Sequence, residues 1–418
     1  MKKLNILQIG TVDNKGGAAL VSYHLKRKLE KLGYITSMFV KRKYSDDKNI
    51  FLIEKQNKLF KKISRLLKKI TTKDIPNYIK NKIRLFLSND IAFFNNKNLL
   101  NSAEFKNADI IHCHNLHGNY FNLKLLQKIS KIKPVIWTLH DMWAITPHEA
   151  WIIKDKNDIV KFSLEINPPF SQKKKVKILK QKKEIYKNSQ LNIIPVSNWL
   201  ERQLKESILK NQNINLIYNG INNITFKKSN KIENRKELNI PLDKKIITFL
   251  ANGGRNNKQK GWEHMEKIIN HYRNNKNILF LCIGGTEEYE QSNNIKYIEY
   301  IKDESLLAKY YSASDIFLFT SLAENFPLTI LEAMSCGTPI VSFDVGGVKE
   351  AVIHKKNGYI AKYQDTDDLI AGIKYIFGLN DDELNRMSQN SIQKIKENFT
   401  LDIMINSYIK LYKNILKK

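Results

Sequence analysis

The sequence predicts an α/β protein with two parallel, doubly wound sheets. Three observations support this prediction: short apolar runs recur along all 418 residues, longer amphipathic stretches separate them, and most runs end in Gly, Asn, Asp or His. Short apolar runs are typical of strands buried on both faces, and the stretches between them are typical of crossover helices. Because such crossovers are right-handed, we expect two Rossmann-like domains that face each other across a cleft.

Six runs in the first half and five in the second are the expected strands. They cover residues 4–10, 34–40, 109–115, 134–140, 191–197 and 214–220, and then 245–254, 277–285, 315–321, 338–344 and 358–363. A turn and a polar stretch follow the sixth of these runs, the one at 214–220. We therefore predict an N-terminal domain at 1–224 and a C-terminal domain at 225–398. The last amphipathic stretch, 399–418, predicts a helix that packs back on the N-terminal domain.

The composition predicts a folded protein in a reducing compartment. Apolar residues make up 42% of the chain, which is enough to bury two cores, and the three cysteines lie far apart without metal-ligand spacing. No run approaches the roughly 18 apolar residues of a membrane span. We therefore expect a soluble, cytoplasmic protein, and we leave open a peripheral attachment to the inner face of the cell membrane.

The net charge of +29 partly reflects a chain rich in lysine throughout, but the charge is uneven: residues 54–89 hold eleven basic and two acidic residues. Such a basic region predicts an anionic partner, which could be nucleic acid, a membrane or a phosphorylated substrate. Residues 57–70 place apolar and basic side chains on opposite arcs of a helix, which fits either an ordinary domain helix or an interfacial helix on anionic lipid. The stretch 172–183 is the best candidate for nucleic-acid binding. No zinc-finger or RNA-recognition signature accompanies it, so we expect no nucleic-acid partner.

Pairs of glycines follow several expected strands or lie in the loops just after them. Glycine at the carboxyl end of a strand lets backbone N–H groups approach an anionic ligand. None of the pairs forms the GxGxxG fingerprint, which disfavours a nicotinamide or flavin enzyme. Their equivalent positions in the two halves predict a ligand cleft. The pairs are Gly16–Gly17, Gly253–Gly254, Gly284–Gly285 and Gly346–Gly347.

Two cations follow one of these pairs and precede a helix expected to begin near Trp262. Arg255 offers a fork of donors and Lys260 a point charge, and together they can neutralise a diphosphate. The alternative is a solvated basic loop.

Two glutamates flank an expected helix start in an otherwise apolar segment. Pro327 suits the first turn of that helix, and Asn325 is then its expected N-cap. Glu324 would lie in the loop ahead of the helix and Glu332 in its first turns, where both can face one ligand. Carboxylates repel a diphosphate, so these groups are expected to accept hydrogen bonds from sugar hydroxyls. Alternatively, Glu324 supports the helix dipole and Glu332 pairs with a lysine.

The ordered set of motifs resembles glycosyltransferase family 4, retaining enzymes with the GT-B fold. Glu-x7-Glu alone would be a weak signal, but further segments in family order cover nearly the whole chain. They are "GGAALVSYHLKRKLEKLGY" from residue 16, "WTLHDMW" from 137, "PVSNWL" from 195, "IYNGI" from 217, "GGRNNKQKGW" from 253, "DVGGVKEAVIHKKNGYI" from 344 and "YIKLYKNIL" from 408.

The resemblance implies a nucleotide-sugar site. Glu332 would hold the ribose hydroxyls, Glu324 the hydroxyls of the transferred sugar, and His140 would lie beside that sugar. The remaining implied contacts concern the diphosphate and the acceptor. They are Arg255, Lys260 and the backbone of Asn325, Phe326, Pro327 and Leu328 for the diphosphate, and Gly16 and Gly17 for the donor phosphates or the acceptor. Asn325 and Pro327 stand where the family often has glycines, which leaves the identity of the sugar open.

The resemblance also implies a hexosyltransferase reaction without a cofactor. The diphosphate leaves, the acceptor hydroxyl enters from the same face, and the leaving phosphate oxygen takes its proton. We expect no Asp-x-Asp metal motif near a strand end of the donor half, and the cationic loop supplies the charge that a metal would supply, so we expect no metal ligand. Nucleotide sugar and a glycan or lipid-linked acceptor are the expected partners, in the synthesis of a bacterial surface polysaccharide such as capsule or lipopolysaccharide.

Other classes of site remain as alternatives. His112, His114 and His117 could bind zinc if a further ligand such as His140 converged on them. Paired carboxylates also occur in glycosidases, but that interpretation leaves the cationic loop and the glycine turns unexplained. A nucleotide-sugar epimerase with the GT-B fold, or a basic nucleic-acid-binding protein, is the remaining alternative.

Overall fold

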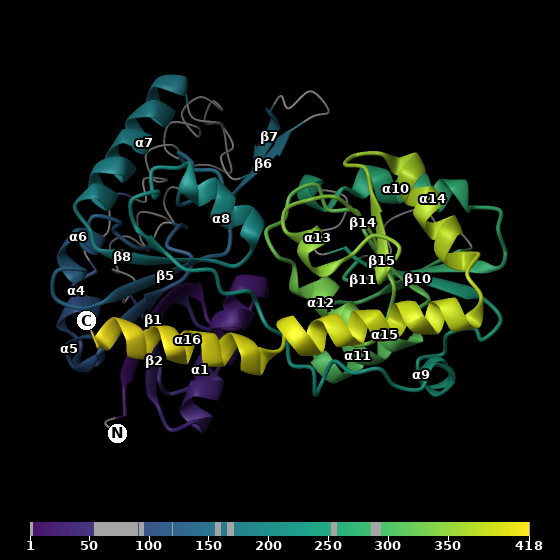
Figure 1. Cartoon of the computed structure of the whole chain (residues 1–418), viewed down its shortest axis with the longest axis horizontal. Coiled ribbons are helices and arrows are strands. Elements are labelled where there is room, and N and C mark those ends of the chain that lie inside the picture. Colours follow the sequence, from purple (N-terminus) through teal and green to yellow (C-terminus); the bar gives the residue numbers. More distant parts are fainter. Residues whose placement is uncertain are drawn as a thin grey trace, which may run out of the picture.

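The computed structural model describes residues 3–53, 91, 96–118, 120–154, 160–164, 171–251, 257–285 and 294–417. Two parallel sheets lie side by side, and helices cover the faces of both (Figure 1). This confirms the predicted α/β architecture of two Rossmann-like layers. The amphipathic segment 57–70, and with it the prediction of an interfacial helix, lies outside the described residues.

The N-terminal sheet has the strand order β3-β2-β1-β4-β5-β8-β9, with every neighbouring pair parallel. Its strands are β1 (Asn5–Val12), β2 (Ile35–Arg42), β3 (Ile50–Leu52), β4 (Ile110–Cys113), β5 (Val135–Leu139), β8 (Leu191–Pro195) and β9 (Asn213–Ile214). Its helices are α1 (Gly17–Lys31), α4 (Lys97–Asn101), α5 (Ala103–Asn107), α6 (Leu125–Ile129), α7 (Gln172–Lys187) and α8 (Asn198–Lys205). Of the expected strand at 214–220, only Ile214 lies in a strand, as the second residue of β9.

The C-terminal sheet has the order β12-β11-β10-β13-β14-β15, again with parallel neighbours. Its strands are β10 (Lys245–Leu250), β11 (Ile278–Ile283), β12 (Ile295–Ile298), β13 (Ile316–Phe319), β14 (Ile340–Phe343) and β15 (Gly358–Ala361). The helices that follow are α9 (Lys231–Glu237), α10 (Trp262–His271), α11 (Glu304–Ala313), α12 (Leu328–Ser335), α13 (Val348–Ala351), α14 (Thr366–Phe377), α15 (Asp381–Asn398) and α16 (Leu401–Leu416). A separate antiparallel hairpin pairs β6 (Trp151–Lys154) with β7 (Val160–Leu164).

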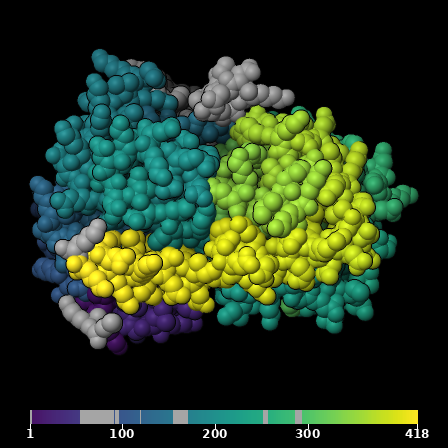
Figure 2. Space-filling view, viewed as in Figure 1, coloured from purple at the N-terminus to yellow at the C-terminus, as the bar shows by residue number. Residues whose placement is uncertain are grey.

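Helix α16 returns from the C-terminal half to the N-terminal sheet. In both views α15 and α16 form a band that runs along the two halves in turn (Figures 1 and 2). The apolar face of α16 packs on one face of the sheet through a cluster that includes Ile6, Ile110, Ile136, Ile194, Met404 and Ile405. None of the helices in the described ranges is long and apolar enough to cross a bilayer.

The chain passes between the two halves twice, and the two crossings contact each other. Ile221 N donates to Phe399 O at 3.0 Å, and Leu401 N donates to Ile221 O at 2.8 Å. A Cβ atom on Gly220 would lie 2.3 Å from the carbonyl oxygen of Thr400, so only glycine allows this approach.

Candidate functional site

A cleft of about 910 Å³ separates the two halves where the carboxyl ends of their strands face each other. It contains every described residue that the family resemblance placed at the site. The N-terminal half contributes Gly16, Gly17 and His140, and the C-terminal half contributes Lys260, Glu324, Asn325, Phe326, Pro327, Leu328 and Glu332. Arg255 and the pair Gly253–Gly254 lie outside the described residues.

The other two glycine pairs do not line this cleft, contrary to the simplest form of the prediction. Gly346 (φ +56°) lies behind the loop that bears Glu324, and a Cβ atom there would be 2.0 Å from the carbonyl oxygen of Glu324. Gly347 N donates to Asn325 O at 2.7 Å. This pair therefore supports the loop from behind, whereas Gly285 packs against Cys282 and Tyr297.

The loop before α12 joins the two halves. The expected N-cap role of Asn325 is wrong, because α12 begins at Leu328 and its N-cap is Pro327, which offers no side-chain acceptor. Asn325 instead shares a 2.5 Å hydrogen bond between its Oδ1 and Ser197 Oγ, and its Nδ2 donates to Leu139 O at 3.3 Å. These bonds fix the loop against the N-terminal half.

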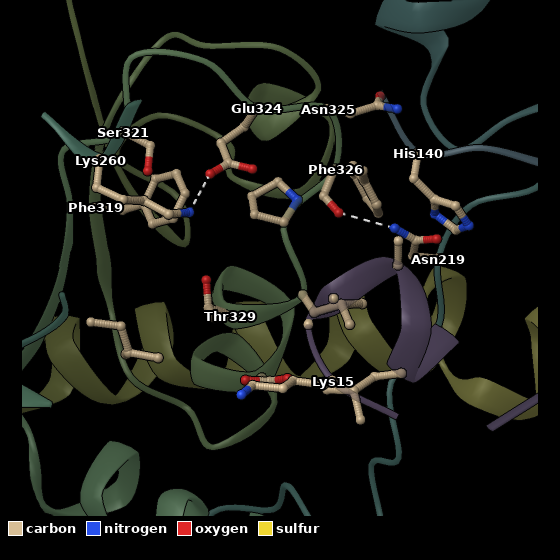
Figure 3. Close-up of a pocket in the computed structure, with 18 of the residues that line it drawn as sticks. Lys15, His140, Asn219, Lys260, Phe319, Ser321, Glu324, Asn325, Phe326 and Thr329 are labelled. Atoms are coloured by element: carbon tan, nitrogen blue, oxygen red, sulfur yellow. Dashed lines mark hydrogen bonds and ion pairs between the residues drawn. The ribbon is translucent and has the colours of Figure 1, made fainter. Parts of the chain in front are cut away.

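Lys260 and Glu324 form an ion pair across the C-terminal wall of the cleft. Lys260 ends the short 3₁₀ helix η2 (Lys258–Lys260), and its Nζ lies 2.6 Å from Glu324 Oε1 (Figure 3). The side chain of Lys260 is 30% exposed and that of Glu324 only 10%. A cation and a hydrogen-bond acceptor are thus held side by side, able to bind a phosphate oxygen and a hydroxyl respectively.

Glu332 is a buried carboxyl group at the floor of the cleft. Its Oε2 accepts a hydrogen bond of 3.1 Å from the Tyr311 hydroxyl. Burial raises the pKa of Glu332 to about 8, against the lowering effect of the Tyr311 hydrogen bond and with a smaller contribution from the charge of Glu304. The group is therefore mostly protonated at neutral pH, and a ligand that donates hydrogen bonds would favour its ionised form.

His140 forms the opposite wall, where Figure 3 shows it near Asn219 and Phe326. Its Nε2 lies 3.1 Å from His114 Nδ1. Burial lowers the pKa of His140 to about 4, although the charge of Asp141 acts in the opposite direction. The imidazole is consequently neutral at physiological pH.

The zinc alternative finds no support in the described part of the chain. Both ring nitrogens of His112 are engaged, by Tyr412 and by Thr138, and His117 Nε2 pairs with Asp141 Oδ2 at 2.8 Å. No group of three or more His, Cys, Asp or Glu side chains in these residues is arranged to hold a metal ion. The C-terminal half does contain an Asp-x-Asp sequence starting at Asp365, but that residue caps α14 and does not line the cleft.

Several site residues were missed by the sequence analysis. Asn219 lies in the quoted "IYNGI" motif and donates from Nδ2 to Phe326 O at 3.1 Å, and Lys15 precedes the first glycine pair at the cleft. Glu350 of α13 accepts from Asn198 N and Trp199 N, both at 2.8 Å, so it caps α8 in the other half. Asn219 and Glu350 both lie in motifs that carry the family resemblance, "IYNGI" and "DVGGVKEAV", but nothing in those motifs indicated these contacts.

Comparison with known proteins covers both halves. Residues 15–223 match the family model described as Glycosyltransferase Family 4, and residues 230–394 match the model described as Glycosyl transferases group 1. N-acetyl-alpha-D-glucosaminyl L-malate synthase of Bacillus anthracis is 26% identical over 54% of this chain and 60% of its own length. A Campylobacter jejuni protein named N,N'-diacetylbacillosaminyl-diphospho-undecaprenol alpha-1,3-N-acetylgalactosaminyltransferase is 28% identical over 44% of this chain and 49% of its own. The chain thus spans about three fifths or less of these relatives.

Solved structures share the fold over nearly the full length. Sucrose-phosphate synthase from Thermosynechococcus elongatus has a TM-score of 0.70 at 18% identity and covers 99% of this chain and 100% of its own. Anabaena HepE, solved in complex with UDP, has a TM-score of 0.64 at 15% identity and covers 98% of this chain and 100% of its own. At these identities the likeness concerns the fold alone.

Proposed function

The chain belongs to the group 1, family 4 glycosyltransferases, and from this premise we propose that it is a retaining enzyme that moves a sugar from a nucleotide diphosphate sugar to an acceptor hydroxyl. The single observation that supports this most is the grouping of Lys260, Glu324, Glu332 and His140 in one cleft between the two sheets. A cation, two carboxyl groups and a neutral imidazole match the phosphates and hydroxyls of such a donor.

The proposed reaction exchanges one bond at the anomeric carbon for another. The bond to the leaving phosphate oxygen breaks, the acceptor oxygen attaches on the same face, and the acceptor proton passes to the leaving phosphate. Lys260, together with Arg255 as the family resemblance implies, stabilises the charge that develops on the diphosphate. Glu324 and His140 hold the transferred sugar, Glu332 holds the ribose, and the backbone from Asn325 to Leu328 and at Gly16 and Gly17 contacts the phosphates or the acceptor.

We further propose a lipid-linked glycan as acceptor, in the synthesis of a surface polysaccharide. Two comparisons support this: the name of the Campylobacter relative includes a diphospho-undecaprenol, and a further relative from Klebsiella pneumoniae is described only as a protein in the cps region. Helix α7 adds a physical reason, because it exposes a row of lysines that suits an anionic membrane surface. These are Lys173, Lys177, Lys180, Lys183 and Lys187.

The test is a transfer assay over a panel of nucleotide sugars, with polyprenyl-diphosphate-linked sugars in anionic vesicles or in detergent as acceptors. We expect one donor to release its nucleoside diphosphate and the acceptor to gain one α-linked sugar, equally with and without EDTA. An inverted linkage would contradict retention, and activity that EDTA abolishes and Mg²⁺ restores would contradict metal independence. An epimerised donor with no glycosylated product would identify the epimerase alternative.

Donor affinity is expected to increase with pH. In the free protein Glu332 keeps its proton up to about pH 8, whereas ribose hydroxyls donate to its ionised form, so binding below pH 8 releases a proton. The logarithm of the association constant should rise between pH 6 and 8 with a slope approaching one. Calorimetry with the intact nucleotide sugar measures this change in the association constant, because its diphosphate diester does not titrate between pH 6 and 8. A flat profile would contradict the role of Glu332, and Glu332→Gln is the control that should be flat.

A further inference from the structure

A layer of buried polar side chains lies between α16 and the wall of the cleft. Alternate residues of a strand share one face, and the face of β4 and β5 that begins with Ile110 and Ile136 carries this layer toward the cleft. Its members are at most 2% exposed, a depth at which polar groups normally have partners. They are His112, His114, Thr138, Tyr408 and Tyr412.

Hydrogen bonds connect this layer to the last helix. Tyr412 OH lies 2.8 Å from His112 Nδ1, and His112 Nε2 lies 2.8 Å from Thr138 Oγ1. Thr138 Oγ1 in turn lies 2.8 Å from the Tyr408 hydroxyl. Both nitrogens of His112 are therefore occupied, and α16 holds the ring from behind.

The layer ends at His140 in the cleft. The rings of His112 and His114 lie 4.4 Å apart between centroids and are tilted by 31°. The rings of His114 and His140 are stacked at 5.4 Å, with the 3.1 Å contact between Nδ1 and Nε2 at their edge. His140 is 8% exposed and lines the cleft. The ring of His140 thus contacts a neighbour, His114, that does not itself line the cleft.

The contact between His114 and His140 has a preferred direction. Burial lowers the pKa of His140 to about 4 and that of His114 well below its usual range, so each ring carries one proton. His114 Nε2 is buried and has no hydrogen-bond partner among the described residues. A buried N–H without a partner is rarer than an unused acceptor, so the proton of His114 belongs on Nδ1. There it donates to His140 Nε2, which leaves the proton of His140 on Nδ1.

We propose that His114 is a positioning residue that holds His140 in the tautomer protonated on Nδ1. His140 then offers an N–H donor to the cleft, and the ligand atom that it recognises must be an acceptor. This inference rests on the proposed function, under which that atom is an oxygen of the donor, either of a sugar hydroxyl or of a phosphate. His114 acts only through its hydrogen bond to His140, whereas His140 itself would contact the ligand.

The test is ring-nitrogen NMR on the full chain labelled with ¹⁵N-histidine, with the His140 signals assigned by loss in His140→Gln. We expect wild-type His140 to carry its proton on Nδ1. His114→Asn, whose amide can donate from about the same position, should preserve that tautomer, and His114→Leu should give a mixture. Tyr186→Phe is the matched control, because it removes a buried 2.9 Å bond to Ala144 O in the same half without touching the layer.

A His140 protonated on Nε2 in the wild type would overturn the proposal, as would a tautomer unchanged in His114→Leu. The wild-type spectrum alone decides the first point, even if the leucine variant fails to fold. With an active enzyme we expect kcat to fall about two- to tenfold in His114→Leu, which is the range for the loss of one neutral hydrogen bond. The KM for the donor should be unchanged in that variant, and kcat should recover in His114→Asn. A tautomer that follows His114 in a protein that transfers no sugar would support this inference and contradict the proposed function.

Discussion

Replacing Lys260 with alanine is expected to lower the rate of sugar transfer by about 10²–10³-fold, the usual effect of removing one electrostatic partner of a developing charge. The Lys260 ammonium group lies in the cleft, 2.6 Å from Glu324 Oε1, and a bound diphosphate would lie within its reach. Because the pair is partly exposed, its loss should change the free energy of unfolding little. The measurement is kcat at saturating donor, with thermal unfolding as a check on the fold.

Lys258→Ala is the matched control for this experiment. Lys258 belongs to the same 3₁₀ helix and carries the same charge, but its side chain is exposed and does not line the cleft. Transfer in this variant should remain within about a factor of two of the parent, since both variants change net charge equally. Near-normal turnover in Lys260→Ala, or an equal loss in both variants, would contradict the assignment.

Replacing Glu332 with glutamine is expected to weaken nucleotide binding at least tenfold and to reduce transfer severely. Hydrogen bonds to a charged group contribute about 1.5–3 kcal/mol, and the amide cannot ionise to accept them from the ribose. The fold should persist, because the Tyr311 hydroxyl can still donate to the amide oxygen. Calorimetry with nucleotide and with nucleotide sugar gives the affinity, and Glu263→Gln, an exposed carboxyl of α10, is the control.

Stability against pH gives a second readout for the same variant. The folded-state pKa of Glu332, about 8, lies above the ordinary value of 4.5. The protonated group is therefore compatible with the fold at low pH, and its contribution to stability is lost progressively as pH rises from about 4.5 to 8, because over this range only the unfolded chain is ionised at this position. Glu332→Gln should be about as stable as the parent near pH 4.5, more stable at pH 6, and more stable still at pH 9. Binding that is unaffected by the substitution would exclude Glu332 from the nucleotide site.

The fold was accessible from sequence because it depends on local pattern. Each of the expected strands overlaps its predicted range, although the one at 214–220 is almost absent. Strands β3 and β12 and the hairpin of β6 and β7 went unpredicted, since they are short, and β12 is only half-buried. Their apolar pattern was too weak to separate them from the loops around them.

The site was predicted where motifs lie close in sequence and missed where contacts are distant. Spacing and residue type predicted Glu324, Lys260 and Glu332, and all three line the cleft. The bonds of Asn325 to Ser197 and Leu139 join residues 128 and 186 positions apart, and no local pattern contains that information. The helix was predicted to begin at Pro327, whereas it begins one residue later at Leu328, because proline can occupy either the N-cap or the first helical position.

The packing of α16 on the N-terminal sheet also sets an order of events during synthesis. The sheet face bearing Ile6, Ile110 and Ile194 is covered by residues that include Met404 and Tyr412, and roughly 200 residues separate the last strand of that face from this helix. At about 5–20 residues per second, an apolar surface on the first half remains uncovered for on the order of 10–40 seconds while the second half is made. The helix that covers this face of the N-terminal sheet is therefore synthesised after the whole C-terminal sheet. His112 can form its hydrogen bond with the Tyr412 hydroxyl only once translation has passed Tyr412.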